Sequence, residues 1–142
     1  MNLQESIRRI LREEHRQIRK EDLLGKTMYH GTTLEGWEYG SMNYLFVTED
    51  IDHAKFHADE KAHDSTKYYK EPHTAIIVKI IIDEDIIDMK WEVDDDGGRY
   101  TEYGYHTWED SYEKIGTFVI VGNLNIDNFP IIYKKRYGSE RV

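Results

Sequence analysis

Cysteine is absent from this chain of 142 residues. Its absence excludes disulfide bonds and metal sites built from thiolates, and it fits a reducing or redox-indifferent compartment. Long apolar runs are also missing, because the longest, AIIVKIII at 75–82, is interrupted by Lys79 and is too short to span a bilayer. The first residues lack the apolar core of a signal peptide. The sequence therefore predicts a soluble, cytoplasmic protein that does not enter a membrane.

Positive charge is scarce, with 19 Lys and Arg against 28 Asp and Glu and a formal net charge of -9. The deficit lies after residue 27, where 12 basic residues face 23 acidic ones, whereas residues 1–27 hold seven basic and five acidic residues. An acidic body makes broad nucleic-acid binding unfavourable, although it leaves room for a small local site for an anionic ligand. The length suits one domain, and 39% hydrophobic residues suit a globular fold.

The first half of the chain indicates helices and short strands. Leu3, Ile7, Ile10 and Leu11 recur at helical spacing, which predicts an amphipathic helix over 1–20 that either packs on the domain or forms a detachable leader. A strand is expected over 27–31, a loop with one helical turn over 33–43, and a second strand over 44–48. A helix is expected over 48–64, capped by Thr48 or Asp50, with a small apolar face formed by Ile51, Ala54, Ala58 and Ala62.

The second half indicates mainly strands. The β-branched run at 73–83 predicts a central strand buried on both faces, followed by a turn and a further strand over 84–93. Residues 94–116 have no clear period and are expected to form a mobile loop. A second buried strand is expected from 117 to Gly122, and a final edge strand over 129–137. The order predicts an α+β domain over 27–142, not an alternating βαβ series.

Four motifs follow one another along the domain: YHGTT at 29–33, NYLFVTED at 43–50, HAKFHA at 53–58 and FVIVGNLNI at 118–126. This succession resembles the ADP-ribosyltransferase superfamily, which includes the poly-ADP-ribose polymerases and diphtheria-like toxins, and it looks closest to small phage and bacterial members. The resemblance covers roughly residues 27–132. It implies a split β-sheet core and an NAD-dependent transferase of the glycosyltransferase class that modifies a host protein or another macromolecule.

The resemblance also implies roles for single residues. His30 matches the histidine that anchors the ribose of NAD, and Gly31 matches the glycine whose backbone holds the nicotinamide amide. Thr32 matches the hydroxyl residue that follows. The aromatic residue of the second motif is matched by either Tyr44 or Phe46, two positions that share one face of a strand. The tyrosine that stacks on the nicotinamide ring is matched by Phe56.

These residue types suit the cleavage of the nicotinamide–ribose bond, which passes through an oxocarbenium-like state. Aromatic faces can hold the flat ring, a glycine lets the backbone approach the carboxamide, and a carboxylate can stabilise the developing positive charge. The family places a glutamate at the start of the late strand, where this chain has Thr117. Glu113, four residues earlier, is the carboxylate that we expect to serve instead, with His30 as the second catalytic residue.

Two alternatives stay open, of which the non-acidic Thr117 favours the first and the acidic charge of residues 28–142 favours the second. The chain could be a binding module on the same fold, which recognises NAD, an ADP-ribosyl group or a protein without chemistry. From another class, it could be an acidic inhibitor that occupies the nucleic-acid groove of a host protein. No metal site is expected: Asp94–Gly98 lacks the ligand pattern of a calcium loop and is expected to be a solvated turn. His53 and His57 lack a third ligand and are expected to be exposed helical histidines.

The first residues suggest a location. Leu11-Arg12-Glu13 resembles the Leu/Ile-x-Glu cleavage signal of phage head-maturation proteases. Cleavage after Glu13 would remove the leader and would fit packaging of the protein in a phage particle before it acts in the host cytoplasm. Recovery of the protein from phage particles with a new N-terminus at Glu14 would support this hypothesis, and an intact Met1 in the particle would contradict it.

Overall fold

The computed structural model describes residues 3–4, 17–39, 42–94 and 106–138. The elements formed by these residues alternate between helices and strands. In chain order they are a 3-10 helix (Lys20–Leu23), β1 (Thr27–Thr33), α2 (Leu34–Tyr39), β2 (Met42–Thr48), α3 (Ile51–Tyr69), β3 (His73–Ile81), α4 (Glu84–Ile87), β4 (Lys90–Glu92), α6 (Trp108–Ile115), β5 (Thr117–Leu124), a 3-10 helix (Ile126–Asn128) and β6 (Ile131–Tyr137).

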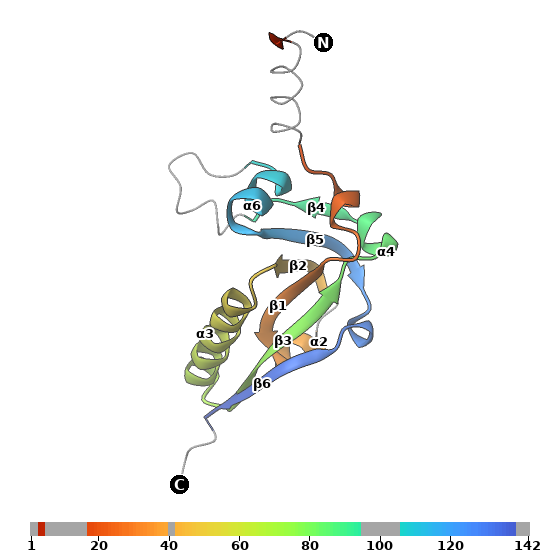
Figure 1. The fold of residues 1–142 in the computed structure, drawn as a ribbon. Helices are drawn as coiled ribbons and strands as arrows, with labels where there is room; N and C mark the ends of the chain where they lie inside the picture. Colours follow the sequence, from red (N-terminus) through yellow and green to blue (C-terminus); the bar gives the residue numbers. More distant parts are fainter. Residues whose placement is uncertain (1–2, 5–16, 40–41, 95–105, 139–142) are drawn as a thin grey trace.

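The six strands form one antiparallel sheet in the order β4-β5-β2-β1-β3-β6 (Figure 1). The predicted α+β class is therefore confirmed. The sheet is held together unevenly, because β1 makes seven register pairs with β3 but a single pair with β2, between Tyr29 and Thr48. Beyond that pair the two strands run on without a shared ladder. We call this place the β1–β2 opening, with His30–Thr33 on one side and Tyr44–Val47 on the other.

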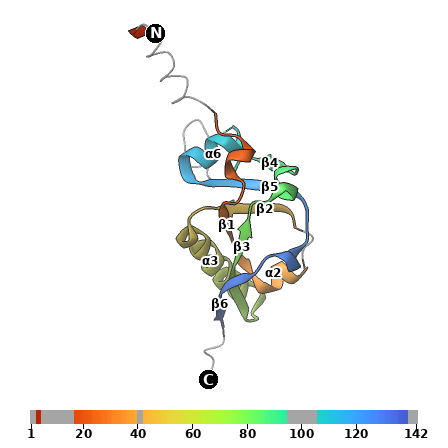
Figure 2. The same ribbon diagram turned by 45° about the vertical axis from the view of Figure 1, so that its right-hand side comes forward.

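The two faces of the sheet are covered differently. One face carries the large core, to which β1 contributes Met28 and α2 contributes Trp37. The other face carries a smaller cluster beneath α3. Figure 2 shows α2 and α3 on opposite sides of β1 and β3. Because successive residues of a strand point to opposite faces, His30 shares the face of Met28, and Gly31 shares the face beneath α3.

Helix α3 has the Asp50 cap and the alanine face that the sequence predicts, and it continues to Tyr69, past its predicted end at residue 64. The side chain of Asp50 caps it by accepting a hydrogen bond from the N–H of Asp52 at 2.9 Å. Three fully buried alanines, four residues apart, form its contact face: Ala54, Ala58 and Ala62. Small side chains let the helix lie close to the sheet. The prediction that Ile51 belongs to the same face is wrong, because this residue starts the helix and is 42% exposed.

Strand β3 confirms the predicted core, whereas β1 and β5 differ from the prediction in where they end. β3 has the consecutive buried residues expected of a strand that is covered on both faces. β5 continues past Gly122 to Leu124, and β1 continues past Gly31 to Thr33, so neither strand ends at its glycine as predicted. Within the predicted loop over 94–116, residues 95–105 lie outside the described part. The remainder holds α6, which ends at Gly116 with φ of 72°.

The N-terminal prediction falls largely outside the described residues. The helix expected over 1–20 does not reach its predicted end, since 17–19 are not helical and the 3-10 helix begins at Lys20. Ile18 packs against the large core. None of the helices formed by the described residues combines the length and apolarity that a membrane crossing requires.

Candidate functional site

His30 joins the two sides of the β1–β2 opening. Its Nδ1 lies 2.6 Å from the carbonyl oxygen of Phe46 on β2. Burial lowers the pKa of His30 to about 4, and the nearby Lys61 and His57 act in the same direction, while the hydrogen bond to Phe46 opposes them. The ring is therefore neutral at pH 7. A neutral imidazole carries one proton, so Nδ1–H donates to Phe46 and Nε2 is left as an acceptor.

The Nε2 atom of His30 is buried and has no hydrogen-bond partner among the described residues. Such groups are uncommon in folded proteins, because an unsatisfied buried acceptor costs about 1–3 kcal/mol. The indole ring of Trp37 lies beside the imidazole, with 5.8 Å between ring centroids. With Nδ1–H engaged, Nε2 can only accept a hydrogen bond.

Gly31 directs its backbone groups into the β1–β2 opening. Lys79 donates its N–H to Pro130 at 2.9 Å, away from β1, and Lys79 pairs with Tyr29. In an antiparallel ladder, the backbone N–H and C=O of alternate residues point to opposite sides. The backbone groups of Tyr29 and Gly31 therefore point away from β3 and toward β2, where Gly31 has no register partner.

Gly31 also has a packing role that the sequence did not reveal. A Cβ added at Gly31 would lie 2.0 Å from the carbonyl oxygen of Ala54 and 3.1 Å from the backbone nitrogen of Ala58. Helix α3 therefore fills the space in which a side chain would stand. The glycine permits the close approach of α3 as well as exposing its own polar edge.

Thr32 and Lys61 meet at the same opening. The Thr32 side chain is buried, and its hydroxyl accepts a hydrogen bond from Nζ of Lys61 at 3.2 Å. Lys61 belongs to α3, whereas Thr32 projects to the opposite face of the sheet from Gly31. The contact is possible because no ladder closes the sheet at this place. Lys61 is a cation next to His30 that sequence analysis missed.

Phe46, not Tyr44, is the aromatic residue of β2 that packs within the site. Its ring lies edge-on to His53 and His57 of α3, with centroid separations of 6.0 and 5.4 Å. Tyr44 shares the face of Phe46 but is 67% exposed. The Nε2 atoms of His53 and His57 lie 3.0 Å apart. These two histidines are half-buried against Phe46, so the prediction of exposed helical histidines is wrong.

Phe56 lies away from this group. It follows Ala54 by two residues, about 200° around the helix, and its ring is 64% exposed. It contributes instead to a shallow hollow on the outer side of α3, together with Lys55, His63 and Tyr137. The residue of α3 that faces Phe46 is the next one, His57. The structure therefore brings together His30, Gly31, Thr32 and Phe46, while Phe56 remains outside.

Thr117 takes part in a buried network of hydrogen bonds, which accounts for a threonine at this position. Its hydroxyl donates to Oδ2 of Asp94 at 2.9 Å, and its carbonyl accepts from the hydroxyl of Ser111 at 2.7 Å. The side chain is fully buried. Asp94 is 4% exposed, so it does not belong to a solvated turn as predicted, and 95–98 lie outside the described residues. Thr117 pairs with Thr48, which places its side chain on the face of Phe46.

Glu113 occupies an exposed position on α6, the helix that precedes β5. The carboxylate that reaches the first residue of β5 is that of Asp94. Another carboxylate nearby, that of Glu49, bonds to Lys26 at 2.8 Å and accepts from the hydroxyl of Tyr112 at 3.0 Å. These hydrogen bonds, led by that from Lys26, lower the pKa of Glu49.

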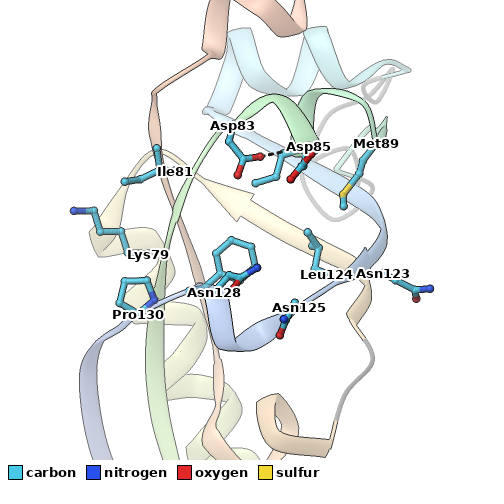
Figure 3. Close-up of a pocket in the computed structure, with 12 residues that line it drawn as sticks. Lys79, Ile81, Asp83, Asp85, Met89, Asn123, Leu124, Asn125, Asn128 and Pro130 are labelled. Carbon is cyan, nitrogen blue, oxygen red and sulfur yellow. Dashed lines mark hydrogen bonds between the residues drawn. The ribbon is translucent and has the colours of Figure 1, made fainter.

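A separate hollow of about 460 Å³ lies where β3, α4, β5 and the start of β6 converge (Figure 3). Its walls mix apolar side chains such as Met89 with Lys79, Asp85 and Asn123. No residue of the predicted site lines it. Among the described residues, no three His, Cys, Asp or Glu side chains are grouped so that they could hold a metal ion.

The residues that sequence analysis missed carry a partial signal. His53, His57 and Lys61 are spaced four apart, which places them along one flank of α3 beside its alanine face. Counting positions from the alanines would have favoured His57 over Phe56. No local sequence pattern marks Asp94 as a site residue, because its contact with Thr117 depends on the chain coming back to this place at residue 117. None of the protein families, curated proteins or solved structures with which the chain was compared matches it.

Proposed function

We propose that the protein is an NAD-dependent ADP-ribosyltransferase that holds NAD at the β1–β2 opening. The observation that supports this most directly is His30. It is a neutral, buried imidazole whose Nε2 is an acceptor without a partner among the described residues, beside two strand edges that share no ladder. A ribose hydroxyl that donates to Nε2 would satisfy this acceptor. Because Nε2 is buried, the hydroxyl reaches it only when a neighbouring side chain, such as that of Trp37, shifts.

The nicotinamide end is assigned to the same opening. A carboxamide has one acceptor and two donor hydrogens, and the backbone N–H and C=O of Gly31 offer the complementary pair. The rings of Phe46 and His57 would supply flat surfaces for the nicotinamide. Phe56 has no part in this arrangement.

The reaction breaks the bond between nicotinamide nitrogen and the ribose carbon, and nicotinamide leaves with the bonding electrons. An acceptor nucleophile on a macromolecule then bonds to that carbon and loses a proton. A carboxylate near the ribose would stabilise the positive charge that develops between the two steps. We assign this role to Asp94 in place of Glu113, because Asp94 is held at the first residue of β5.

The proposal is tested with NAD labelled on its adenylate group. Full-length protein is incubated with the label and host-cell lysate, and both label transfer and nicotinamide release are measured. Transfer should be lost in His30→Ala and retained in His63→Ala, an exposed histidine on the far part of α3. Asp94→Asn should reduce release and Glu113→Gln should not. The reverse order would reassign the carboxylate, and absence of NAD binding would reject the function.

A binding module is the second candidate, and Thr117 favours it. A threonine whose hydroxyl is committed to a buried bond cannot replace the carboxylate of the family. The same incubation separates the candidates. NAD binding without label transfer and without nicotinamide release would leave the protein as a binder of NAD or of ADP-ribosyl groups.

A further inference from the structure

Charge is divided between the two ends of the molecule. The end that carries α4, β4 and α6 has nine acidic and two basic residues within 81–94 and 106–118, and the segment 17–26, which contacts it through Lys20, adds two acidic and three basic residues. The opposite end, formed by the last turns of α3 and by β6, has six basic and two acidic residues within 61–73 and 131–138. Figure 1 shows these two groups of elements at opposite ends of the ribbon. We call the second group the basic end. Its cations are Lys61, Lys67, Lys70, Lys134, Lys135 and Arg136.

The basic end combines residues from two parts of the chain. Along β6, Lys135 and Tyr137 lie on the face beneath α3, whereas Lys134 and Arg136 lie on the opposite face at the edge of the sheet. The register pairs Tyr137 of β6 with His73, and Arg136 with Thr74, so β6 ends beside the turn that follows α3. A hollow is shared by Lys67 and Lys70 of that region and Gly138 after β6.

The cations of this surface are not neutralised by partners. Within the described part of the chain, no ion pair involves Lys67, Lys70, Lys134, Lys135 or Arg136. Of the acidic residues at this end, Asp64 lies 3.6 Å from His63. Glu35 of α2 accepts from the N–H of Thr74 and lines a hollow with Tyr69 and Glu71. In contrast, Lys26 is paired with Glu49 and Lys90 with Glu92. Unpaired cations grouped on one surface attract a polyanion.

Exposed aromatic rings lie among these cations. Tyr68 is 79% exposed and Tyr69 is 62% exposed, and their centroids are 4.8 Å apart. The ring of Tyr69 also stacks on His73 at 5.6 Å. Nζ of Lys135 lies 5.1 Å from the ring centre of Tyr137. Such an alternation of flat rings and cations is the composition of surfaces that bind single-stranded nucleic acid.

We propose that the basic end binds single-stranded nucleic acid, with phosphates on Lys67, Lys70, Lys134 and Arg136 and bases on Tyr68 and Tyr69. An acidic peptide would use the cations but would leave the tyrosine faces without a role. Strand addition to the free edge of β6 is opposed by its three consecutive cations. The proposal does not depend on NAD binding.

The experiment measures fluorescence anisotropy of a labelled oligouridylate with the full-length protein at low salt. Lys134→Glu/Arg136→Glu should weaken binding about tenfold or more, because phosphate contacts dominate such affinities. Lys90→Glu/Lys114→Glu changes the net charge equally at the acidic end and should have little effect. Tyr68→Ala/Tyr69→Ala should weaken binding by about tenfold, whereas Tyr68→Phe/Tyr69→Phe should retain it. Circular dichroism checks that each variant is folded.

Three outcomes would overturn the proposal. The first is no binding of the oligonucleotide at low salt. The second is equal weakening by the two charge-reversal pairs, which would show that net charge alone is responsible. The third is undiminished binding by folded Tyr68→Ala/Tyr69→Ala together with equal affinity for polyglutamate, which would identify an acidic protein segment as the partner.

Discussion

His30 on β1 and Phe46 on β2 are linked by a hydrogen bond from the imidazole Nδ1–H to the backbone carbonyl oxygen, with 2.6 Å between the heavy atoms. The two strands share one register pair, so this side-chain bond takes the place of the missing ladder beyond it. The same residue therefore stabilises the sheet and offers the site its unpartnered Nε2.

His30→Ala is expected to lower the free energy of unfolding by about 1–3 kcal/mol, because it removes a buried hydrogen bond and leaves a cavity. Urea denaturation measures the change. His63→Ala is the matched control, since that histidine is exposed and should leave the urea midpoint unchanged. Equal midpoints for His30→Ala and the parent protein would show that the bond to Phe46 contributes nothing.

Stability should fall as the pH is lowered from 6.5 to 4. Burial lowers the pKa of His30 from 6.5 to about 4, so between these values the unfolded chain binds a proton that the folded protein does not. Above pH 6.5 both states are neutral, and below pH 4 both are protonated, so the loss from this residue is complete at pH 4. It amounts to roughly 3 kcal/mol.

The pH effect is isolated by comparison with His30→Gln, which does not titrate. Unfolding free energies of both proteins are measured from pH 7 to pH 4.5. The difference between them should change with pH in the direction given above. A constant difference would mean that His30 titrates normally in the folded protein.

Gly31→Ala should destabilise the protein by about 2 kcal/mol or more, because the added methyl would lie 2.0 Å from the carbonyl oxygen of Ala54 and α3 would have to move. Thermal unfolding followed by circular dichroism gives the melting temperature. Gly36→Ala is the control, since this exposed helical glycine should change stability by under about 1 kcal/mol. Equal melting temperatures for Gly31→Ala and the parent would contradict the close packing of α3 on β1.

Thr117→Val should lower the unfolding free energy by about 1–3 kcal/mol, because the buried carboxylate of Asp94 loses a hydrogen-bond donor. Thr117→Ser retains the hydroxyl and should lose less. Chemical denaturation of the three proteins tests the order. If valine is tolerated as well as serine, the hydroxyl is not needed by Asp94.

The network around Thr117 also predicts the effect of a glutamate at this position. Thr117→Glu would bring a second carboxylate against Asp94 in a buried place, and like charges there oppose folding. We expect an aggregated or unfolded protein instead of a gain of activity. Recovery of soluble, folded Thr117→Glu would contradict this expectation.

Local patterns in the sequence were sufficient for most elements of the fold. The alanines at 54, 58 and 62 and the cap at Asp50 define α3, and the β-branched run at 75–82 defines a strand that is buried on both faces. Strand limits were less accurate. A glycine ends a strand only when its backbone must turn. Gly31 continues in a regular pair with Ile77, and Gly122 lies at an irregularity of register that β5 passes before it ends at Leu124.

The candidate site was only partly predictable, because its geometry depends on pairings between distant segments. The residues marked by the motif at 29–33 lie beside Phe46 of the second motif, and their role in binding NAD stays a prediction. Choosing between Phe56 and His57 requires knowing which face of α3 points toward Phe46. The contact of Asp94 with Thr117 joins residues 23 positions apart in the chain, and no local pattern indicates it.

The separation of acidic and basic ends gives the molecule a permanent electric dipole along its length. Two copies in dilute salt would attract each other with the basic end of one against the acidic end of the next. That contact uses different surfaces on the two partners, so it does not close into a symmetric pair and can extend into rows. Added salt screens the attraction beyond about 10 Å. The apparent mass of this protein should therefore fall toward that of the monomer as ionic strength rises. Sedimentation velocity at several salt concentrations measures this trend.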